Sequence, residues 1–358
     1  MFRRFHTRGV STPATGKNIV ICLDGTGNQV RANGNTNVVC VFEMLDLSDP
    51  ARQIAYYDPG VGTFSARGAW TPIARWFSRI LGLAFGNGLR TNLAEAYTYL
   101  IEHWRPGDRV FIFGFSRGAY TARALAGLLH EPGLLRPGSE NLVQYIVSAY
   151  TRKTTDWDEL HQYTNAFCSK SADGRFSIPV EFLGVWDTVK AAGLLRWALH
   201  WPFTRQVPNV AKAFHAVSID EKRRPYREYL VLPRSERTVL TETWFAGVHS
   251  DVGGTFVDDP KLARIALKWM ADGALDAGVL LRADAYRKNC ALATADASGR
   301  VHDMGWIWAL LTYRHRTVPP GARVHASVRA RCETDSRYRR RIPADARWED
   351  EQWTKPHL

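Results

Sequence analysis

A serine between two glycines is the residue in this sequence best placed to do chemistry. In FIFGFSRGAY (111–120), Gly114, Ser116 and Gly118 form the pattern Gly-x-Ser-x-Gly. An apolar run precedes the serine and a run of small residues follows it, which predicts a strand, a sharp turn and a helix. Both glycines are then needed, because a side chain there would collide with the neighbouring strand or helix. Ser116 is predicted to be a nucleophile of acyl transfer; an ordinary turn with an incidental serine is the alternative.

A serine hydroxyl is a good nucleophile only when a base takes its proton and an acid orients that base. One known order of the three residues along a chain is Ser, then Asp or Glu, then His. Asp187 lies 71 residues after Ser116, and His249 lies 62 residues further on. Both end predicted strands, so in a parallel sheet they would emerge at the same edge as Ser116. We therefore predict Ser116, Asp187 and His249 as a catalytic triad.

Other readings of these residues stay open. Asp187 could cap a following helix, since Asp is favoured there. Asp251 could replace it as the orienting acid if the chain folds back. His249 could be a structural histidine, in which case His325, in VHASV, is the main rival base and His215 the next. His249 is preferred because it follows a clear strand within a glycine-rich loop.

Acyl transfer also needs N–H donors for the negative charge that develops on the carbonyl oxygen. The amide of Arg117, at the start of the predicted helix, is one donor. A second is expected from an early loop that follows a strand. DGTGN (24–28) occupies that place, and the amides of Gly25 and Thr26 are the candidates. An ordinary turn is the alternative; a Walker-type nucleotide site is unsupported because G-x-x-x-x-G-K-[ST] does not occur.

Strands must alternate with helices to position these side chains. Apolar runs ending at Gly, Pro or Asp predict buried strands, and stretches with a 3.6-residue period predict helices. The predicted strands lie within 17–28, 52–63, 108–115, 178–189 and 242–254, and the helices within 87–104, 116–130 and 260–275. This alternation predicts an α/β fold with a mostly parallel central sheet and helices on both faces.

The chain shows no internal repeat and no long low-complexity linker. We therefore expect one catalytic domain over residues 17–330, with a flexible basic leader over 1–16 and a basic C-terminal tail over 331–358. The leader lacks an apolar signal core, and no stretch of about 18 uncharged apolar residues predicts a transmembrane helix. Five widely spaced cysteines without a C-x-x-C pair favour a reducing cytosol over a disulfide framework or a cysteine zinc site.

The formal net charge of +12 permits binding to nucleic acid, attraction to anionic membranes, or solubility alone. No nucleic-acid-binding module is recognisable, so no nucleic acid partner is expected. The composition, with 45% hydrophobic and 23% charged residues, excludes a disordered chain. The densest basic cluster is interpreted as part of a solvated tail and comprises Arg337, Arg339, Arg340 and Arg341.

Six motifs occur in the order LDGTGN, GVGT, GFSRGAYTAR, FLGVWDTV, GVHSDVGG and VHASV. Together they resemble the catalytic domain of the bacterial type VI secretion phospholipase effectors, over roughly residues 17–330. The resemblance implies an α/β-hydrolase fold and an esterase or phospholipase with the triad Ser116, Asp187 and His249. Because these three side chains suffice for acyl transfer, no metal and no cofactor is expected. It implies a lipid or other acyl-ester substrate and a cytoplasmic location in the producing bacterium. Export without a signal peptide stays open as an alternative.

Two apolar stretches, 70–86 and 194–203, suggest a lipid-facing surface or a lid-type insertion, and a third, 304–316, is an apolar patch without an assigned role. A helix over the first stretch would have one apolar stripe with arginines on its other side, as in helices that lie at membrane interfaces. Peripheral contact with an anionic membrane follows from this reading, and packing on the sheet is its alternative. The stripe consists of Ile73, Trp76, Phe77, Ile80, Leu81 and Ala84.

Other functions compete with lipid hydrolysis. An esterase for small esters needs the same triad and no membrane contact. A non-catalytic binding protein on a hydrolase fold would show a lost triad member, and none is lost here. A metal-dependent hydrolase built on His249 and Asp251 is the weakest alternative.

Overall fold

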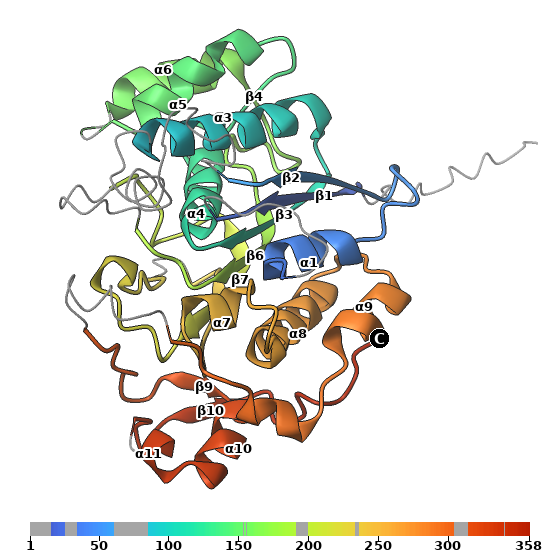
Figure 1. Ribbon diagram of the computed structural model, residues 1–358. Helices are drawn as coiled ribbons and strands as arrows, with labels where there is room; N and C mark the ends of the chain where they lie inside the picture. The colour runs from blue at the N-terminus through green and yellow to red at the C-terminus, as the bar shows by residue number, and fades with distance from the viewer. Residues whose placement is uncertain are drawn as a thin grey trace, which may run out of the picture.

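The structure is a computed structural model (Figure 1). It describes residues 16–25, 34–60, 85–152, 154, 156–190, 200–232, 236–303, 314–339 and 341–358. Within them, eight strands form one sheet in the order β10-β9-β8-β7-β6-β3-β1-β2, and every pairing is parallel. The strands are β1 Asn18–Leu23, β2 Gln53–Asp58, β3 Arg109–Phe115, β6 Val180–Trp186, β7 Val210–Ser218, β8 Val239–Phe245, β9 Arg323–His325 and β10 Arg347–Glu349. A separate antiparallel pair consists of β4 Leu134–Leu135 and β5 Cys168–Ser169.

Helices cover both faces of this sheet, as predicted. Figure 1 shows α3, α4, α5 and α6 on one side and α1, α7, α8 and α9 on the other. The helices are α1 Asn37–Met44, α3 Phe85–His103, α4 Arg117–His130, α5 Val143–Tyr150, α6 Trp157–Phe167, α7 His249–Gly253, α8 Lys261–Asp276, α9 Ala283–Cys290, α10 Ala326–Thr334 and α11 Ser336–Arg339, with 3₁₀ turns η1 Glu140–Leu142, η2 Arg224–Tyr226 and η3 Thr294–Ser298. Among the described residues, no helix has the length and apolar character needed to cross a bilayer.

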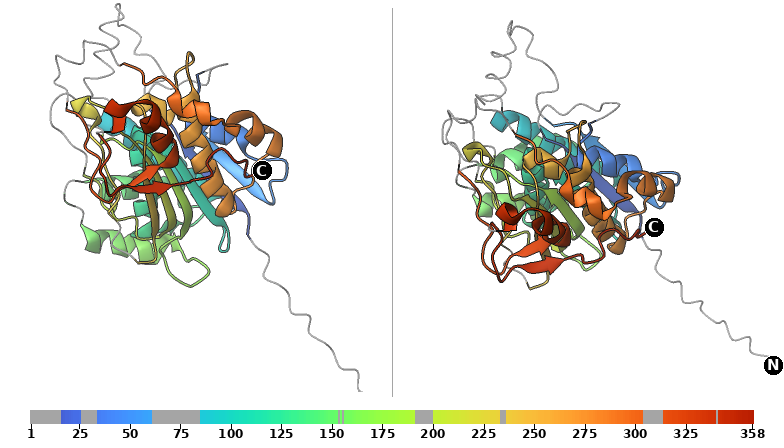
Figure 2. Two further views of the ribbon diagram at one scale, coloured as in Figure 1. Left: turned by 90° about the horizontal axis from the view of Figure 1, so that it is seen from below. Right: turned by 60° about the horizontal axis from the view of Figure 1, so that its bottom comes forward.

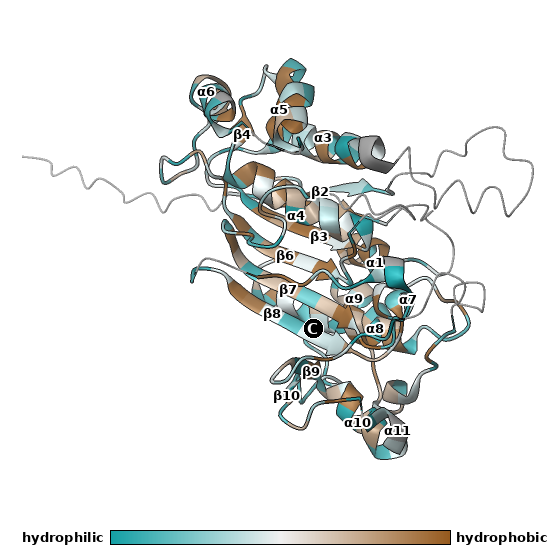
Figure 3. Cartoon of the chain, turned by 90° about the vertical axis from the view of Figure 1, so that its left-hand side faces the viewer, coloured by the Kyte–Doolittle hydropathy of each residue, from teal (hydrophilic) through white to brown (hydrophobic). Residues whose placement is uncertain are grey.

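The central strands are apolar on both faces because both faces are covered. In β1, Ile19, Ile21 and Leu23 pack in the cluster that contains α3 and α4, whereas Val20 and Cys22 pack in the cluster that contains α1 and α8. Figure 3 shows the same hydrophobic character along β3 and β6. This is why the sheet strands read as continuous apolar runs in the sequence.

The prediction that residues 331–358 form a basic tail outside the catalytic domain is wrong. Within this segment β10 pairs with β9 and extends the sheet by one strand, and Trp353 is only 5% exposed. The side chains of Tyr338 and Arg341 bond to Asp220 at the end of β7. Figure 2 shows these C-terminal elements, in red, against the body of the molecule. A strand of three residues, such as β10, is too short to show an alternation of apolar and polar residues. The many arginines of this segment also make it look like a solvent-exposed tail.

Candidate active site

Ser116 lies in a strained turn between β3 and α4. Its backbone has φ 59° and ψ −117°, a conformation that costs energy for any residue except glycine. A Cβ on Gly114 would lie 2.6 Å from the carbonyl oxygen of Gly118, and a Cβ on Gly118 would collide with the backbone of Leu23 and Asp24. The close approach of β1, β3 and α4 thus excludes side chains on both sides of the serine, and the turn lifts Ser116 to the carboxyl edge of the sheet.

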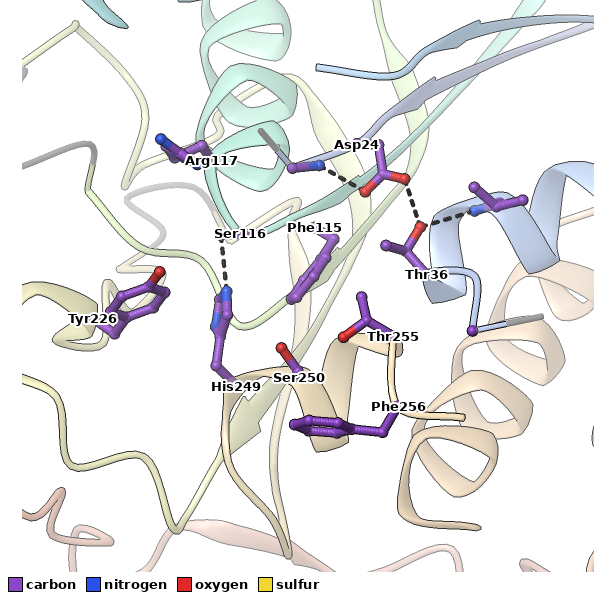
Figure 4. A pocket seen from close by; sticks show the side chains of 13 residues that line it. Asp24, Thr36, Phe115, Ser116, Arg117, Tyr226, His249, Ser250, Thr255 and Phe256 are labelled. Carbon is purple, nitrogen blue, oxygen red and sulfur yellow. Dashed lines mark hydrogen bonds between the residues drawn. The ribbon is translucent and has the colours of Figure 1, made fainter. Parts of the chain in front are cut away.

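A continuous chain of hydrogen bonds joins Ser116, His249 and Asp187. Figure 4 shows its first link, from Ser116 to His249. The Nδ1 atom of His249 lies 2.6 Å from Oδ2 of Asp187, and its Nε2 atom lies 2.8 Å from Oγ of Ser116. The Asp187 carboxylate can only accept, so Nδ1 carries the proton and Nε2 accepts from the serine hydroxyl. The structure therefore brings the three predicted residues together in the geometry that activates a serine.

The strand ends explain this convergence. Asp187 follows β6 directly, and β6 is the neighbour of β3 in the sheet. His249 was predicted at a strand end, but β8 stops at Phe245 and His249 is instead the first residue of α7. Gly247, with φ 110°, turns the chain between them. A Cβ on Gly247 would collide with Asp251, so this turn also requires glycine.

Arg316 is a partner of Asp187 that sequence reasoning did not find. Its guanidinium binds both carboxylate oxygens, with NH1 2.5 Å from Oδ1 and NH2 3.1 Å from Oδ2. NH1 also donates to the carbonyl and hydroxyl oxygens of Ser218, at 3.0 and 2.8 Å. Both Asp187 and Arg316 are buried, so this is a buried, bidentate ion pair behind the histidine. An isolated arginine in a sequence gives no sign of such a role.

The loop that carries His249 is held by a second group of buried charges. Oε2 of Glu221 accepts from the backbone amide of His249 at 3.2 Å, and the Glu221 carboxylate is paired with Arg223 at 2.7 Å. Asp220 accepts from the amide of Gly247 at 2.7 Å. The histidine is thus fixed by its backbone as well as by its ring. These acids stand at the end of β7, a strand that was not predicted.

Charge and burial set the protonation of the site. Burial alone would raise the pKa of Asp187, but Arg316 and His249 outweigh it and hold that pKa below its usual value. Burial lowers the pKa of His249 below 6.5, and the bond to Asp187 offsets part of this effect. At neutral pH, His249 is therefore neutral and able to accept a proton, and Asp187 is ionised.

A cavity of about 360 Å³ opens in front of Ser116. Figure 4 shows Tyr226 on one side of His249 and Phe115 and Phe256 on the other. The His249 ring stacks on Phe115, with centroids 4.6 Å apart, and meets Tyr226 edge-on at 4.9 Å. The rest of the lining comes from the loop after β1, the start of α1, the start of α4, and Ser250 and Thr255. The cavity is large enough for the reacting part of an ester to reach the serine.

Of the backbone N–H groups predicted to donate to the carbonyl oxygen, that of Arg117 is suitably placed and that of Gly25 is not. Arg117 is the first residue of α4, where the N–H groups point away from the helix toward the serine end, and it lines the cavity. Gly25 also lines the cavity, but its amide donates to Oδ1 of Asp24 at 2.6 Å. The expectation for Gly25 is therefore wrong in this structure, because the preceding side chain occupies the amide. Thr26 lies outside the described residues.

The structure separates the rival residues from Ser116. His325 is four strands away from β3 along the sheet, or roughly 19 Å at about 4.8 Å per strand. Its ring nitrogens face Ser327 and Asp350, so the alternative assignment of His325 as the base is wrong. His215 bonds to Glu242 and Arg123. Asp251 bonds to His302 at 2.5 Å and to the amide of Val248, so it does not orient His249.

The apolar stretches proposed as a lid fall largely outside the described residues. The structure does not describe residues 61–84, 191–199 and 304–313. The stripe from Ile73 to Ala84 and the lid hypothesis therefore stay predictions. Near the end of the stretch 194–203, Trp201 is buried and its backbone amide donates to the hydroxyl of Tyr120. Arg316, the last residue of the stretch 304–316, is paired with Asp187. In the described part of the second stretch, Trp201 therefore packs in the core, whereas His200 is exposed.

A parallel sheet with helices on both faces and a strained serine turn between strand and helix defines an α/β-hydrolase-like fold. The chain belongs to the family of Tle1-like phospholipase effectors of the type VI secretion system, because the model of their catalytic domain matches residues 17–273. This match confirms the resemblance seen in the sequence motifs.

Individual proteins are more distant. An uncharacterized protein of Saccharomyces cerevisiae is 33% identical over 233 residues, which are 62% of this chain and 34% of that protein, so the match spans about a third of the relative. An uncharacterized Pseudomonas aeruginosa protein of known structure is 22% identical, with a TM-score of 0.42 over 78% of this chain and 48% of that one. The Tle1 effector bound to the VgrG spike of the Type 6 secretion system is 18% identical, with a TM-score of 0.34 over 68% of this chain and 52% of that one.

Proposed function

We propose that this protein is a serine hydrolase that cleaves carboxylic ester bonds of lipids, with phospholipids as the preferred class. The observation that carries the proposal is the hydrogen-bonded chain from Ser116 through His249 to Asp187 at the floor of an open cavity. Membership of a phospholipase effector family supports the lipid substrate. An esterase for small esters without a membrane role is the second candidate, and it would use the same residues.

The reaction follows from the geometry. Ser116 Oγ attacks the ester carbonyl carbon while Nε2 of His249 takes the hydroxyl proton, and the carbonyl oxygen becomes an oxyanion near the N-terminus of α4. His249 then gives the proton to the departing alcohol, and an acyl-enzyme remains on Ser116. Water attacks the acyl carbon after His249 takes one of its protons, the acid leaves, and Ser116 regains its hydrogen. Asp187 keeps its charge throughout and holds His249 in the required tautomer.

A panel of substrates tests this proposal. Wild-type protein is expected to hydrolyse p-nitrophenyl esters and phospholipids, and Ser116→Ala to lose activity on all of them, because Ser116 is the hydroxyl that His249 bonds among the described residues of the lining. Release of p-nitrophenol and of fatty acid is measured. Equal activity of Ser116→Ala and wild type would remove the serine mechanism, and hydrolysis confined to short esters would favour the small-ester candidate.

The pH dependence should reflect the lowered pKa of His249. Only the neutral imidazole can accept the serine proton, so kcat/KM is lost as the pH falls through that pKa. Since burial places it below 6.5, activity should be at its plateau at neutral pH and decline only below pH 6.5. The profile is measured with a soluble p-nitrophenyl ester, whose reactivity does not depend on vesicle charge. A midpoint above 6.5 would contradict the structure.

A further inference from the structure

A second, smaller depression adjoins the Ser116 cavity. Its volume is about 200 Å³, and its lining comes from two segments, residues 221–228 around η2 and residues 314–317. Tyr226 lines this depression and also the Ser116 cavity. A group seated in the depression would thus be separated from the proposed nucleophile by one side chain.

Arginines dominate the lining, and two of them already have partners. Arg223 is paired with Glu221 at 2.7 Å, and Arg316 is paired with Asp187 at 2.5 Å. These pairs are buried and neutralise one another, so they supply rigid walls and little net charge. One further carboxylate in the lining, that of Glu228, lies 3.7 Å from Nε of Arg316.

Three other arginines of the lining are exposed: Arg224, Arg227 and Arg314. Within the part of the chain that the structure describes, no carboxylate lies within ion-pair distance of any of them. Among the residues that line the depression, Glu228 is the one carboxylate besides Glu221, which Arg223 neutralises. Three unpaired guanidinium groups around one depression form a strongly positive site, and guanidinium groups match the geometry of phosphate oxygens.

Tyr226, which separates the depression from the Ser116 cavity, is held in place by several contacts. The guanidinium carbon of Arg223 lies 3.6 Å from the ring centroid of Tyr226, and the same ring meets the His249 ring edge-on, with centroids 4.9 Å apart. The carbonyl oxygen of Tyr226 accepts from NH2 of Arg316 at 2.5 Å. Tyr226 therefore keeps a constant separation between an anion in the depression and the carbonyl that Ser116 would attack.

We propose that Arg224, Arg227 and Arg314 form a binding site for a phosphate group, and that the group is the phosphodiester of a phospholipid whose acyl ester lies at Ser116. The choice of the lipid phosphate rests on the proposed function, because it requires that the acyl ester of the same lipid molecule is hydrolysed at Ser116. A free phosphate ion offers the same chemistry to these arginines. The two sources differ in whether the phosphate belongs to the molecule that is hydrolysed.

The first experiment measures binding without catalysis. Inorganic phosphate and glycerophosphate are titrated by calorimetry, at low ionic strength, into Ser116→Ala and into the same protein with Arg224→Ala, Arg227→Ala and Arg314→Ala. In the variant without the three arginines, affinity should fall at least about tenfold, since the loss of even one charge-assisted hydrogen bond to the phosphate has an effect of that size. Unchanged affinity would overturn the site.

Arg287→Ala is the matched control for lost charge. Arg287 is exposed on α9, which follows Leu280, and Leu280 bonds to Gln53 at the amino end of β2. This places the control at the edge of the sheet opposite to Ser116. Its affinity for phosphate should equal that of the unaltered protein; an equal loss there would show a general effect of charge and overturn the site.

The second experiment distinguishes the two sources of phosphate. The ratio of kcat/KM for dihexanoylphosphatidylcholine to kcat/KM for p-nitrophenyl hexanoate should fall about tenfold or more in the triple arginine variant. A fall in phosphate affinity with an unchanged ratio would overturn the lipid assignment in favour of free phosphate. If wild-type protein cleaves neither ester while phosphate binding still depends on the arginines, the proposed function fails and the phosphate site stands.

Discussion

Replacing His249 with alanine should reduce kcat/KM on any ester by a factor on the order of 10⁴ or more, because the members of a Ser-His-Asp unit act together. His249 is the only group within hydrogen-bond distance of Ser116 Oγ in the described part of the chain. Without it nothing removes the serine proton. The measurement is steady-state hydrolysis of a p-nitrophenyl ester by the purified variant, with folding checked by circular dichroism.

His325→Ala is the matched comparison for this change. His325 is also a buried histidine with two hydrogen-bonded partners, so its loss disturbs packing in a similar way. Because it lies at the far side of the sheet, its effect on kcat/KM per folded molecule should be far smaller. The opposite ranking of the two variants would mean that the base is not His249.

Replacing Asp187 with asparagine should cost activity and stability together. Activity should fall about 10⁴-fold, as expected when the orienting acid of such a unit becomes neutral. The free energy of unfolding should fall by about 3–5 kcal/mol, because Arg316 would then be a buried charge without its main partner. Kinetics and denaturant unfolding measure the two effects separately.

The double variant Asp187→Asn with Arg316→Met separates the catalytic role of Asp187 from its structural one. Removing the unpaired guanidinium should recover much of the lost stability, since no buried charge remains. Activity should stay low, because His249 still lacks the carboxylate. Recovery of activity together with stability would show that Asp187 serves only to neutralise Arg316.

The strand ends were predictable from the sequence, and with them the convergence of Ser116, Asp187 and His249. Apolar runs that stop at a polar residue locate the carboxyl edge of a parallel sheet, whatever the exact length of each strand. The same reasoning did not place His249 in α7, since the three residues between β8 and that helix continue the apolar run.

Partners that depend on tertiary packing could not be predicted. Arg316 and Glu221 act on the site through bonds to residues 129 and 28 positions away, and neither belongs to a local pattern. The occupied amide of Gly25 depends on the rotamer of Asp24. β7 contains the buried apolar residues Val210, Ala213, Ala216 and Val217, and their density favours a strand although they do not alternate.

The most direct test of the central claim is covalent labelling of Ser116 by a fluorophosphonate probe. The probe reacts with an activated serine, and the altered residue can be located by tryptic mapping. Cleavage after Arg109 and Arg117 releases the peptide VFIFGFSR, in which Ser116 is the one hydroxyl-bearing residue. We predict that the adduct is found on this peptide in the wild type and that labelling is abolished in Ser116→Ala. Labelling that persists unchanged in Ser116→Ala, or an adduct on another peptide, would contradict the account.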